Sequence, residues 1–369
     1  MNIDTITITQ NDKYKTVVYP HYTDAEECTG SVVVLHGMAE HHDRYNEFAD
    51  FLNAHGYDVF LYDHRGHGKD KKYEELGHFA DNNGYRPVIN DAKAVLDYVG
   101  RRNRGYRLIL FGHSMGSLIA RNVAAEYPDI DALILCGTAQ QPGILTGVGS
   151  LLASIVKSFK GADYRSPFLS NLTTGYKEFA RISNRTKFDW LSRDNNVVGL
   201  YINDPCCGFL CTAAFYHDLI HLTGTASSTA IIRKMSRNLP ILVISGTDDP
   251  VGGYGKGIVK FFSLLQKYGF DRSDCIIYDE CRHELLNELN KDEIMQDIVN
   301  WLGKIGDPDD TKKTGRTAQP DMSGDRRRET SAGEGKHAET SVGEVKHDEI
   351  TSGEDDHKEI SAGEIKSET

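Results

Sequence analysis

The sequence has 369 residues, with 42 Lys and Arg against 54 Asp and Glu, and a formal net charge of −12. An acidic chain without clustered Lys and Arg lacks the electrostatic footprint of a nucleic-acid-binding protein, so DNA and RNA are not expected partners. Seven irregularly spaced cysteines do not suggest a disulfide framework, the first residues do not form a secretion signal, and no apolar run is long enough to span a bilayer. We expect a cytoplasmic protein.

The first segment of the chain predicts a hairpin, because apolar positions at 3–8 and 17–18 flank a polar turn at 11–13. Four short apolar runs typical of buried strands follow, at 31–35, 59–62, 108–111 and 132–135. Segments with helical spacing separate them, at 45–56, 90–99 and 118–127. Strands that alternate with helices predict right-handed crossovers and a mainly parallel sheet, so the expected fold class is α/β.

This alternation stops in a helix-prone region at about 138–238, and apolar runs at 241–244 and 275–278 then resume it. An insertion at this point would lie over the carboxyl ends of the strands, where open α/β sheets bind ligands. We therefore predict a helical cap. Its apolar segment 145–156 fits either packing on the main domain or contact with a lipid surface, and we favour packing.

The composition changes near Ile305. Aromatic residues end at Trp301, and from Glu329 onward variants of the unit ETSAGEGKHA repeat every ten residues. A period of ten suits neither a heptad nor a solenoid, and the repeats have little apolar surface to bury. We predict a folded domain over residues 1–305 and a disordered acidic tail over 306–369, whose partner the sequence does not identify.

The segment Gly112-His113-Ser114-Met115-Gly116 has the pattern G-x-S-x-G between a predicted strand and a predicted helix. Its glycines allow a turn sharp enough to project Ser114 above the sheet. The alternative is a serine that caps a helix after a tight turn. The strand, turn and helix around the pattern favour Ser114 as a nucleophile.

A serine nucleophile needs an imidazole to take its proton and a carboxylate to orient that imidazole, and in this arrangement the chain order is Ser, acid, His. Asp248 and Asp249 follow the apolar run at 241–244, and His283 follows the run at 275–278. Both groups lie at carboxyl ends of predicted strands, as Ser114 does. Other histidines after Ser114 belong to the predicted cap and follow no strand. The residues alone do not choose between the two aspartates.

Attack on an ester carbonyl creates an oxyanion that needs N–H donors aimed at it. We expect the backbone N–H of Met115, which follows the nucleophile, and that of Met38, which follows the strand ending at His36-Gly37.

Three groups of side chains offer metal-ligand chemistry: Glu40 with His41 and His42, the pair His64 and His67, and the cysteines Cys206, Cys207 and Cys211. None has the helical spacing H-E-x-x-H or a second ligand pair. We predict solvated or hydrogen-bonded histidines, buried thiols and no metal. No cofactor is expected either, because the glycine-rich segment 253–257 matches no phosphate-binding pattern.

Several motifs together resemble the monoacylglycerol lipase and lysophospholipase branch of the α/β hydrolases. They are His36-Gly37-Met38-Ala39-Glu40-His41, Asp63-His64-Arg65-Gly66-His67-Gly68, the segment around Ser114, and Arg282-His283-Glu284. The resemblance covers most of residues 30–303. In relatives with Asp-Pro-Val-Gly the acid precedes proline, which favours Asp249 over Asp248. Lys69 and the acidic tail depart from the family pattern.

This resemblance implies the α/β-hydrolase fold and a serine carboxylester hydrolase with Ser114, Asp249 and His283 as its catalytic residues. The implied substrate is a single-chain acyl lipid, a monoacylglycerol or a lysophospholipid, and transient contact of the cap with a membrane surface would suit it. Alternatives on the same residues are a thioesterase, a general carboxylesterase or an aminopeptidase. A vestigial hydrolase that serves as a scaffold with an interaction tail is the alternative outside enzymes.

Overall fold

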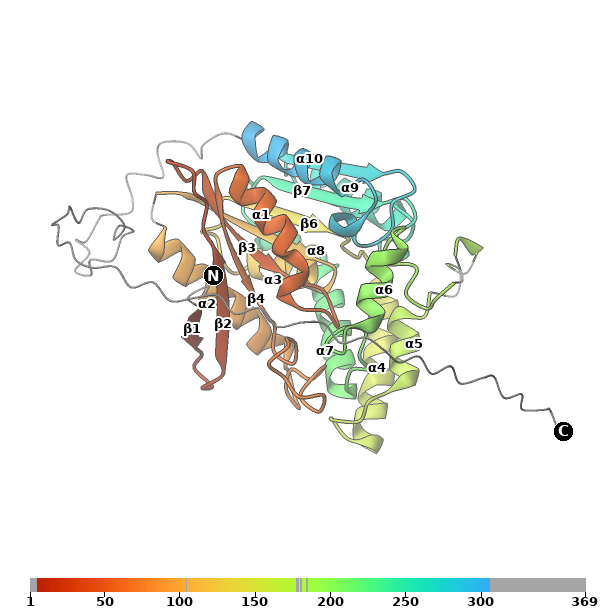
Figure 1. The fold of residues 1–369 in the computed structure, drawn as a ribbon. Coiled ribbons are helices and arrows are strands. Elements are labelled where there is room, and N and C mark those ends of the chain that lie inside the picture. Colours follow the sequence, from red (N-terminus) through yellow and green to blue (C-terminus); the bar gives the residue numbers. More distant parts are fainter. Residues whose placement is uncertain (1–4, 104, 177–178, 180, 184, 306–369) are drawn as a thin grey trace, which may run out of the picture. The chain divides into compact units, whose positions relative to one another are not determined.

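The computed structural model describes residues 5–103, 105–176, 179, 181–183 and 185–305. All of them belong to one compact unit of the chain, residues 1–316. The predicted disordered tail, with its ten-residue repeats, lies outside the described residues. Figure 1 shows a central sheet with helices on both of its faces and a group of helices beyond one end of the strands.

The sheet has eight strands in the order β1-β2-β4-β3-β5-β6-β7-β8. Their bounds are β1 (Ile6–Thr9), β2 (Lys15–His21), β3 (Gly30–Leu35), β4 (Tyr57–Tyr62), β5 (Arg107–His113), β6 (Ala132–Cys136), β7 (Ile241–Gly246) and β8 (Ser273–Tyr278). β1 and β2 form an antiparallel hairpin at one edge, and β2 pairs antiparallel with β4. The remaining pairs, along the order β4-β3-β5-β6-β7-β8, are all parallel. The predicted hairpin and the predicted α/β class are confirmed.

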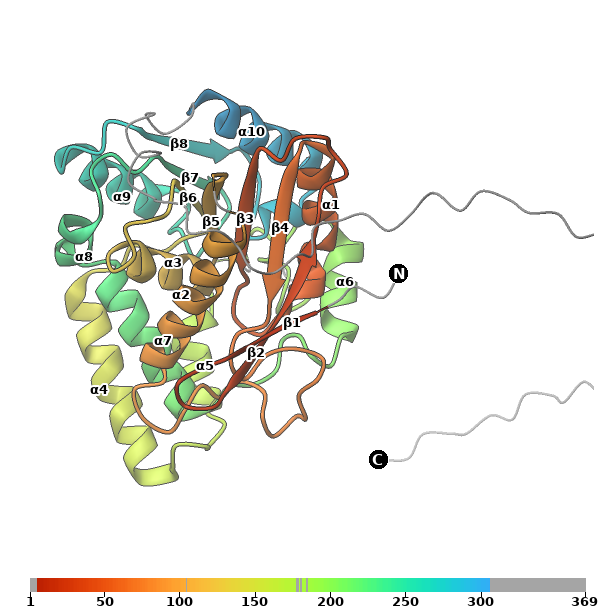
Figure 2. The ribbon, with the colours of Figure 1, turned by 90° about the vertical axis from the view of Figure 1, so that its left-hand side faces the viewer.

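Two layers of helices cover the sheet, as Figure 2 shows. The helices are η1 (His42–Tyr45), α1 (Asn46–Ala54), α2 (Tyr85–Arg102), α3 (Met115–Ala124), α9 (Lys256–Lys267), η3 (Leu285–Asn287) and α10 (Lys291–Lys304). Val33 and Leu110 pack with residues of α2, α3 and α9, whereas Val32 and Ile109 pack with residues of α1 and α10. Alternate residues of the central strands thus enter different cores, which explains why these strands read as continuous apolar runs.

Residues 137–240, between β6 and β7, form the region that we call the cap. It contains α4 (Gly143–Lys160), α5 (Pro167–Thr174), α6 (Asn195–Asn203), α7 (Ala213–Ala226) and α8 (Thr229–Lys234). Four of these helices begin at a side chain that accepts a hydrogen bond from a backbone N–H of the first turn, namely Ser166, Asp194, Thr212 and Ser228. These N-caps explain where the helices begin in a region without a regular strand pattern.

Helix α4 packs on α7 of the cap, where Gly149 lies against Ile220. Six of its apolar side chains are exposed: Ile144, Leu145, Val148, Leu151, Ile155 and Phe159. The predicted packing of segment 145–156 is seen for Ala153, which is buried in the core, and for Val156, which packs against it, but not for the exposed side chains. Within the described residues, no helix combines the length and the apolar character needed to cross a membrane.

Candidate active site

The segment from β5 to α3 makes the sharp turn that the sequence predicts. Ser114 has φ 51° and ψ −118°, a strained conformation for a residue with a side chain. A Cβ on Gly116 would lie 2.0 Å from the carbonyl oxygen of Leu35, and one on Gly112 would lie 2.6 Å from the carbonyl oxygen of Gly116. Both positions therefore require glycine, and α3 begins directly after Ser114 rather than at Leu118 as its apolar spacing suggested.

His283 and Asp249 lie together at the ends of neighbouring strands. The Nδ1 atom of His283 is 3.0 Å from Oδ1 of Asp249, and both side chains are buried. Asp249 is itself held, because it accepts hydrogen bonds from the backbone N–H of Val251 at 2.8 Å and from Oγ of Ser245 at 3.3 Å. A carboxylate held in this way favours the tautomer of His283 with its proton on Nδ1, which leaves Nε2 as a base.

The Nε2 atom of His283 is buried and has no hydrogen-bond partner among the described residues. His283 and Ser114 line the same cavity. Asp248, by contrast, is partly exposed and makes no hydrogen bond to His283 within the described part of the chain. The structure thus brings Ser114, His283 and Asp249 to one place and leaves Asp248 outside it.

The two expected amide donors line the same cavity as Ser114. Met115 is the first residue of α3, so its N–H has no acceptor within the helix. Met38 lies in the turn after β3, and no hydrogen-bond acceptor for its N–H is found in the described ranges. The two amides are therefore available to a ligand at Ser114.

The turn around Met38 is fixed by its neighbours. The N–H of Gly37 donates to the carboxylate of Glu40, and the N–H of Ala39 donates to Nε2 of His67 at 3.2 Å. Ala39 has φ 54°, a left-handed conformation that these hydrogen bonds hold in place. His67 is buried, and burial lowers its pKa to about 4, so the ring stays neutral and Nε2 can accept.

A buried charge network joins this turn to the segment around His283. Arg44 contacts Glu40 at 2.6 Å and makes two hydrogen bonds of 2.6 Å to Glu284. His113 Nδ1 lies 3.2 Å from Glu40, and Tyr45 donates to the same carboxylate at 2.8 Å. Burial alone would raise the pKa of Glu40, but the hydrogen bond with His113 and the charge of Arg44 lower it well below its usual range. Glu40 is therefore ionised inside the protein.

The cap reaches the same two segments. The backbone N–H groups of His283 and Glu284 donate to the carbonyl oxygens of Trp190 and Leu191, at 3.3 and 2.7 Å. The ring of Trp190 lies 5.0 Å from that of His283. Arg282 donates to two further carbonyl groups of the cap, those of Asp189 and Ser192. The cap segment 188–192 thus supports the residues on either side of His283.

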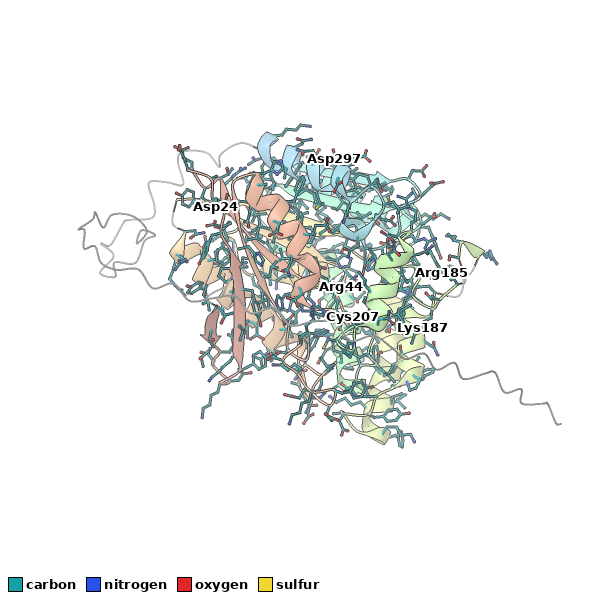
Figure 3. All side chains as sticks on the ribbon, in the orientation of Figure 1. Asp24, Arg44, Arg185, Lys187, Cys207 and Asp297 are labelled. Carbon is teal, nitrogen blue, oxygen red and sulfur yellow. The ribbon has the colours of Figure 1, made fainter. Side chains whose placement is uncertain are left out.

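A second cap segment contacts the turn around Met38. Tyr201 and the N–H of Gly208 both donate to the carbonyl oxygen of Ala39 at 2.9 Å. The guanidinium of Arg44 lies 4.9 Å from the centre of the Tyr201 ring. Figure 3 shows Arg44 at this junction between the sheet domain and α6.

The cavity over Ser114 has a volume of about 1040 Å³, at the upper end of the range for small-molecule sites. Its walls are mainly apolar side chains of the cap helices, including Leu145, Val148, Leu152, Leu172, Leu219 and Ile220. Ser114 and His283 line the same cavity, and so do polar side chains of the cap such as Thr146, Ser170 and Asn171. The mainly apolar walls suit a long apolar chain.

Three histidines of the sequence motifs, His36, His64 and His67, form a buried cluster in which the rings are tilted or edge-on to one another. Burial lowers the pKa of His64 to about 3. Neither ring nitrogen of His64 has a partner among the described residues, so the prediction of a solvated or hydrogen-bonded His64 is wrong. The predicted burial of Cys207 and Cys211 is confirmed, and Cys206 is only partly buried.

Sequence reasoning missed the network of Glu40, Arg44 and Glu284 and the contacts from the cap. Glu40 and Glu284 lie in the sequence motifs and Arg44 follows the first of them, so all three were visible as charged positions. Their pairing was not, because 240 residues separate Arg44 from Glu284 and no local pattern reports such a contact.

Comparisons with known proteins agree with the fold. A sequence model described as serine aminopeptidase, S33, matches residues 26–290. Monoglyceride lipase of Homo sapiens is 36% identical over 285 residues, which are 74% of this chain and 82% of that protein. Monoacylglycerol lipase of Mycolicibacterium smegmatis is 27% identical over 292 residues, which are 78% and 92% of the two chains.

Among solved structures, a highly thermostable carboxyl esterase from Bacillus coagulans, in complex with glycerol, is similar with a TM-score of 0.75 and 27% identity. The match covers 83% of this chain and 99% of the esterase. The chain therefore belongs to the serine aminopeptidase S33 family and is a hydrolase of the monoacylglycerol lipase-like branch of the α/β hydrolases.

Proposed function

We propose that this protein is a serine carboxylester hydrolase that cleaves the acyl ester of a single-chain lipid through an acyl-enzyme at Ser114. The observation that carries the proposal is the meeting of three segments at one mainly apolar cavity. Ser114 lies there in a strained turn, and the buried pair His283 and Asp249 lies there with a ring nitrogen that has no other partner in the described structure.

In the proposed reaction, Oγ of Ser114 attacks the ester carbonyl while Nε2 of His283 takes the hydroxyl proton. Asp249 holds Nδ1 of His283 and stabilises the imidazolium that forms. The amides of Met38 and Met115 receive the oxyanion. His283 then gives the proton to the leaving glycerol oxygen, and a water molecule releases the fatty acid by the same steps.

Replacing the nucleophile tests this proposal. In Ser114→Ala, turnover of a short p-nitrophenyl ester should fall at least about a thousandfold, and labelling by a fluorophosphonate should disappear. Ser154→Ala is a matched control, because Ser154 lies on α4 and donates to Ser150 of the same helix. Turnover and labelling that survive unchanged in Ser114→Ala would exclude the acyl-enzyme.

We further propose monoacylglycerol rather than lysophospholipid as the preferred substrate. The two carboxylates that line the cavity together with Ser114, Glu40 and Glu284, are both paired with Arg44, so they present no unpaired negative charge to a neutral glycerol group. The negative charge of a phosphate would lie near these two carboxylates, and Arg44 is already paired with them and would not be free to neutralise it. Comparing kcat/KM for monoacylglycerols and lysophospholipids of the same chain length tests this, and preferred turnover of thioesters or aminoacyl amides would favour the alternative hydrolases.

The exposed face of α4 supports transient contact with a lipid surface. Leu151 and Phe159 lie on this face with 62% and 84% of their surface exposed, and neither lines the cavity. Cosedimentation with phosphatidylcholine vesicles should weaken in the double variant Leu151→Gln, Phe159→Gln. Val259→Gln is the control, since Val259 is 55% exposed on α9, outside the cap. Equal binding by both variants would contradict the assignment of this face.

The seven cysteines are all free, which supports a protein of the reducing cytoplasm that meets lipid at a surface. A scaffold role of the acidic tail would be an addition to hydrolysis rather than its replacement, because the residues proposed for catalysis are all present.

A further inference from the structure

A group of three different ligand types lies where the cap meets the turn around Met38. His41 follows that turn, and Asp204 and Cys207 follow α6. One possible ligand atom from each of the three lies within 4.8 Å of the others. His41 and Cys207 are buried, and Asp204 is partly exposed. Figure 3 shows Cys207 beside the sheet domain at this junction.

We propose that His41, Asp204 and Cys207 form a binding site for Zn²⁺ that fastens the cap to the turn around Met38. This site is separate from the proposed catalytic residues and does not depend on the proposed function. It departs from the sequence-based prediction of no metal, which considered His41 and Cys207 separately, because the histidine and the other two residues are more than 160 positions apart and share no spacing pattern.

The donor atoms suit zinc better than other common divalent ions. One imidazole nitrogen, one carboxylate oxygen and one thiolate sulfur are a set that zinc accepts, whereas Ca²⁺ and Mg²⁺ prefer oxygen ligands alone. Zinc bonds of about 2.0–2.3 Å in a tetrahedron place ligand atoms about 3.3–3.7 Å apart. In the structure, Nε2 of His41 lies 2.9 Å from Oδ2 of Asp204, so these two atoms would separate slightly and the sulfur would approach. Water would supply the fourth ligand.

The second ring nitrogen of His41 supports this assignment. Nδ1 is buried without a hydrogen-bond partner among the described residues, and Oδ2 of Asp43 lies 3.9 Å from it. A histidine that ligates zinc through one nitrogen usually donates its other N–H to a carboxylate. Zinc on Nε2 would place the His41 proton on Nδ1. The Asp43 carboxylate, which also pairs with Lys69 and His42, would have to move closer to accept it.

The charges also balance. Zinc binding would form a bond from the metal to Sγ of Cys207 and release the thiol proton to solvent. The resulting thiolate and the Asp204 carboxylate carry two negative charges, which Zn²⁺ neutralises. The cap segment 204–208 already touches the turn through the hydrogen bond from Gly208 to Ala39. A metal bridge would add a second fastening at the same junction.

Metal titration of the full-length, untagged protein tests the proposal. After treatment with a chelator, the protein should bind one Zn²⁺ with an affinity that falls at least about 100-fold in Cys207→Ser and in Asp204→Asn. Asp43→Asn should lower the affinity less, by about tenfold, because Asp43 supports a ligand without touching the metal. Cys211→Ser is the matched control, since this buried thiol lies in the same part of the cap and outside the group of three.

Two readouts do not depend on hydrolysis. Co²⁺ in place of zinc should give a thiolate charge-transfer band that is present in Cys211→Ser and absent in Cys207→Ser. Zinc should also slow amide exchange in segment 195–208 of the native protein and not of Cys207→Ser. Circular dichroism establishes that each variant is folded, and Asp204→Asn provides a second test if Cys207→Ser is not. A zinc affinity or a cobalt band that is unchanged in folded Cys207→Ser would place the metal elsewhere and overturn the proposal.

Discussion

The sheet domain and the cap hold their parts of the site in different ways. In the sheet domain, residues at strand ends are buried and fixed by backbone geometry, as the turn at Ser114 and the Asp249–His283 contact show. In the cap, α4, α5 and α6 expose large apolar side chains, including Ile144, Phe168 and Leu200. From the proposed function we therefore expect the sheet domain to determine the reaction and the cap to determine what reaches it. Substitutions in the two regions should therefore have different effects.

The largest effect should come from the acid that holds His283. In Asp249→Asn, the amide no longer fixes the Nδ1 proton, so kcat should fall by about 10³–10⁴. Asp248→Asn is the neighbouring control and should change kcat only slightly, because Asp248 is partly exposed and does not contact His283 among the described residues. Steady-state kinetics on a soluble ester measures both. A larger loss in Asp248→Asn would reverse the assignment of the acid.

The same substitution in the two regions should have opposite effects on stability. A methyl group on Gly116 of α3 would meet the carbonyl oxygen of Leu35 at 2.0 Å. Gly116→Ala should therefore lower the free energy of unfolding by about 3 kcal/mol or more. Gly147 of α4 has no atom within 4 Å of the added methyl group, so Gly147→Ala should raise it by about 1 kcal/mol. Urea unfolding measures the free energy of unfolding of both variants. Equal changes would mean that α3 accommodates the added methyl group as easily as α4 does.

Acid should destabilise the sheet domain through its buried histidines. Burial lowers the pKa of His64 to about 3 and that of His67 to about 4, from an ordinary value of 6.5. Between pH 6.5 and pH 5 the unfolded chain binds protons at these residues and the folded chain does not. Each histidine should therefore remove roughly 2 kcal/mol of stability over this interval, with full stability above pH 6.5.

Urea unfolding at pH 7 and pH 5 measures this loss. Other titrating groups contribute as well, and His113 acts in the opposite direction, because the hydrogen bond and charge of Glu40 outweigh its burial and raise its pKa. The difference between the protein and His64→Phe isolates one residue. An unchanged pH dependence in His64→Phe would mean that folding does not shift the pKa of His64.

The sheet domain was largely predictable from the sequence. Buried strands are visible as apolar runs, and the chain order of Ser114, the aspartates and His283 follows from the ends of those strands. Helix starts were less visible. α2 begins at Tyr85 rather than at Asn90, because Pro87 lies in its first turn, where a missing N–H costs no hydrogen bond. The choice of Asp249 rested on family resemblance, and in the structure Asp249 is the aspartate that contacts His283.

The cap and its contacts were less predictable, for a physical reason. The exposed stripe of α4 has the same apolar periodicity as a packed helix, so the pattern alone does not reveal whether another element covers it. The pairing of Arg44 with Glu284 and of His41 with Asp204 joins segments that are distant in the chain. Such contacts depend on the completed fold and leave no local pattern.

The smallest effect should come from removing the residues after Ile305. The residues proposed for catalysis and the lining of the cavity all precede this point, so the shortened chain should hydrolyse a soluble ester with kcat/KM within about twofold of the full chain. Hydrolysis of monoacylglycerol in vesicles is the informative second measurement. A loss with vesicles alone would assign the tail to delivery of substrate, together with the cap, whereas a loss with the soluble ester would show that residues 306–369 support the sheet domain itself.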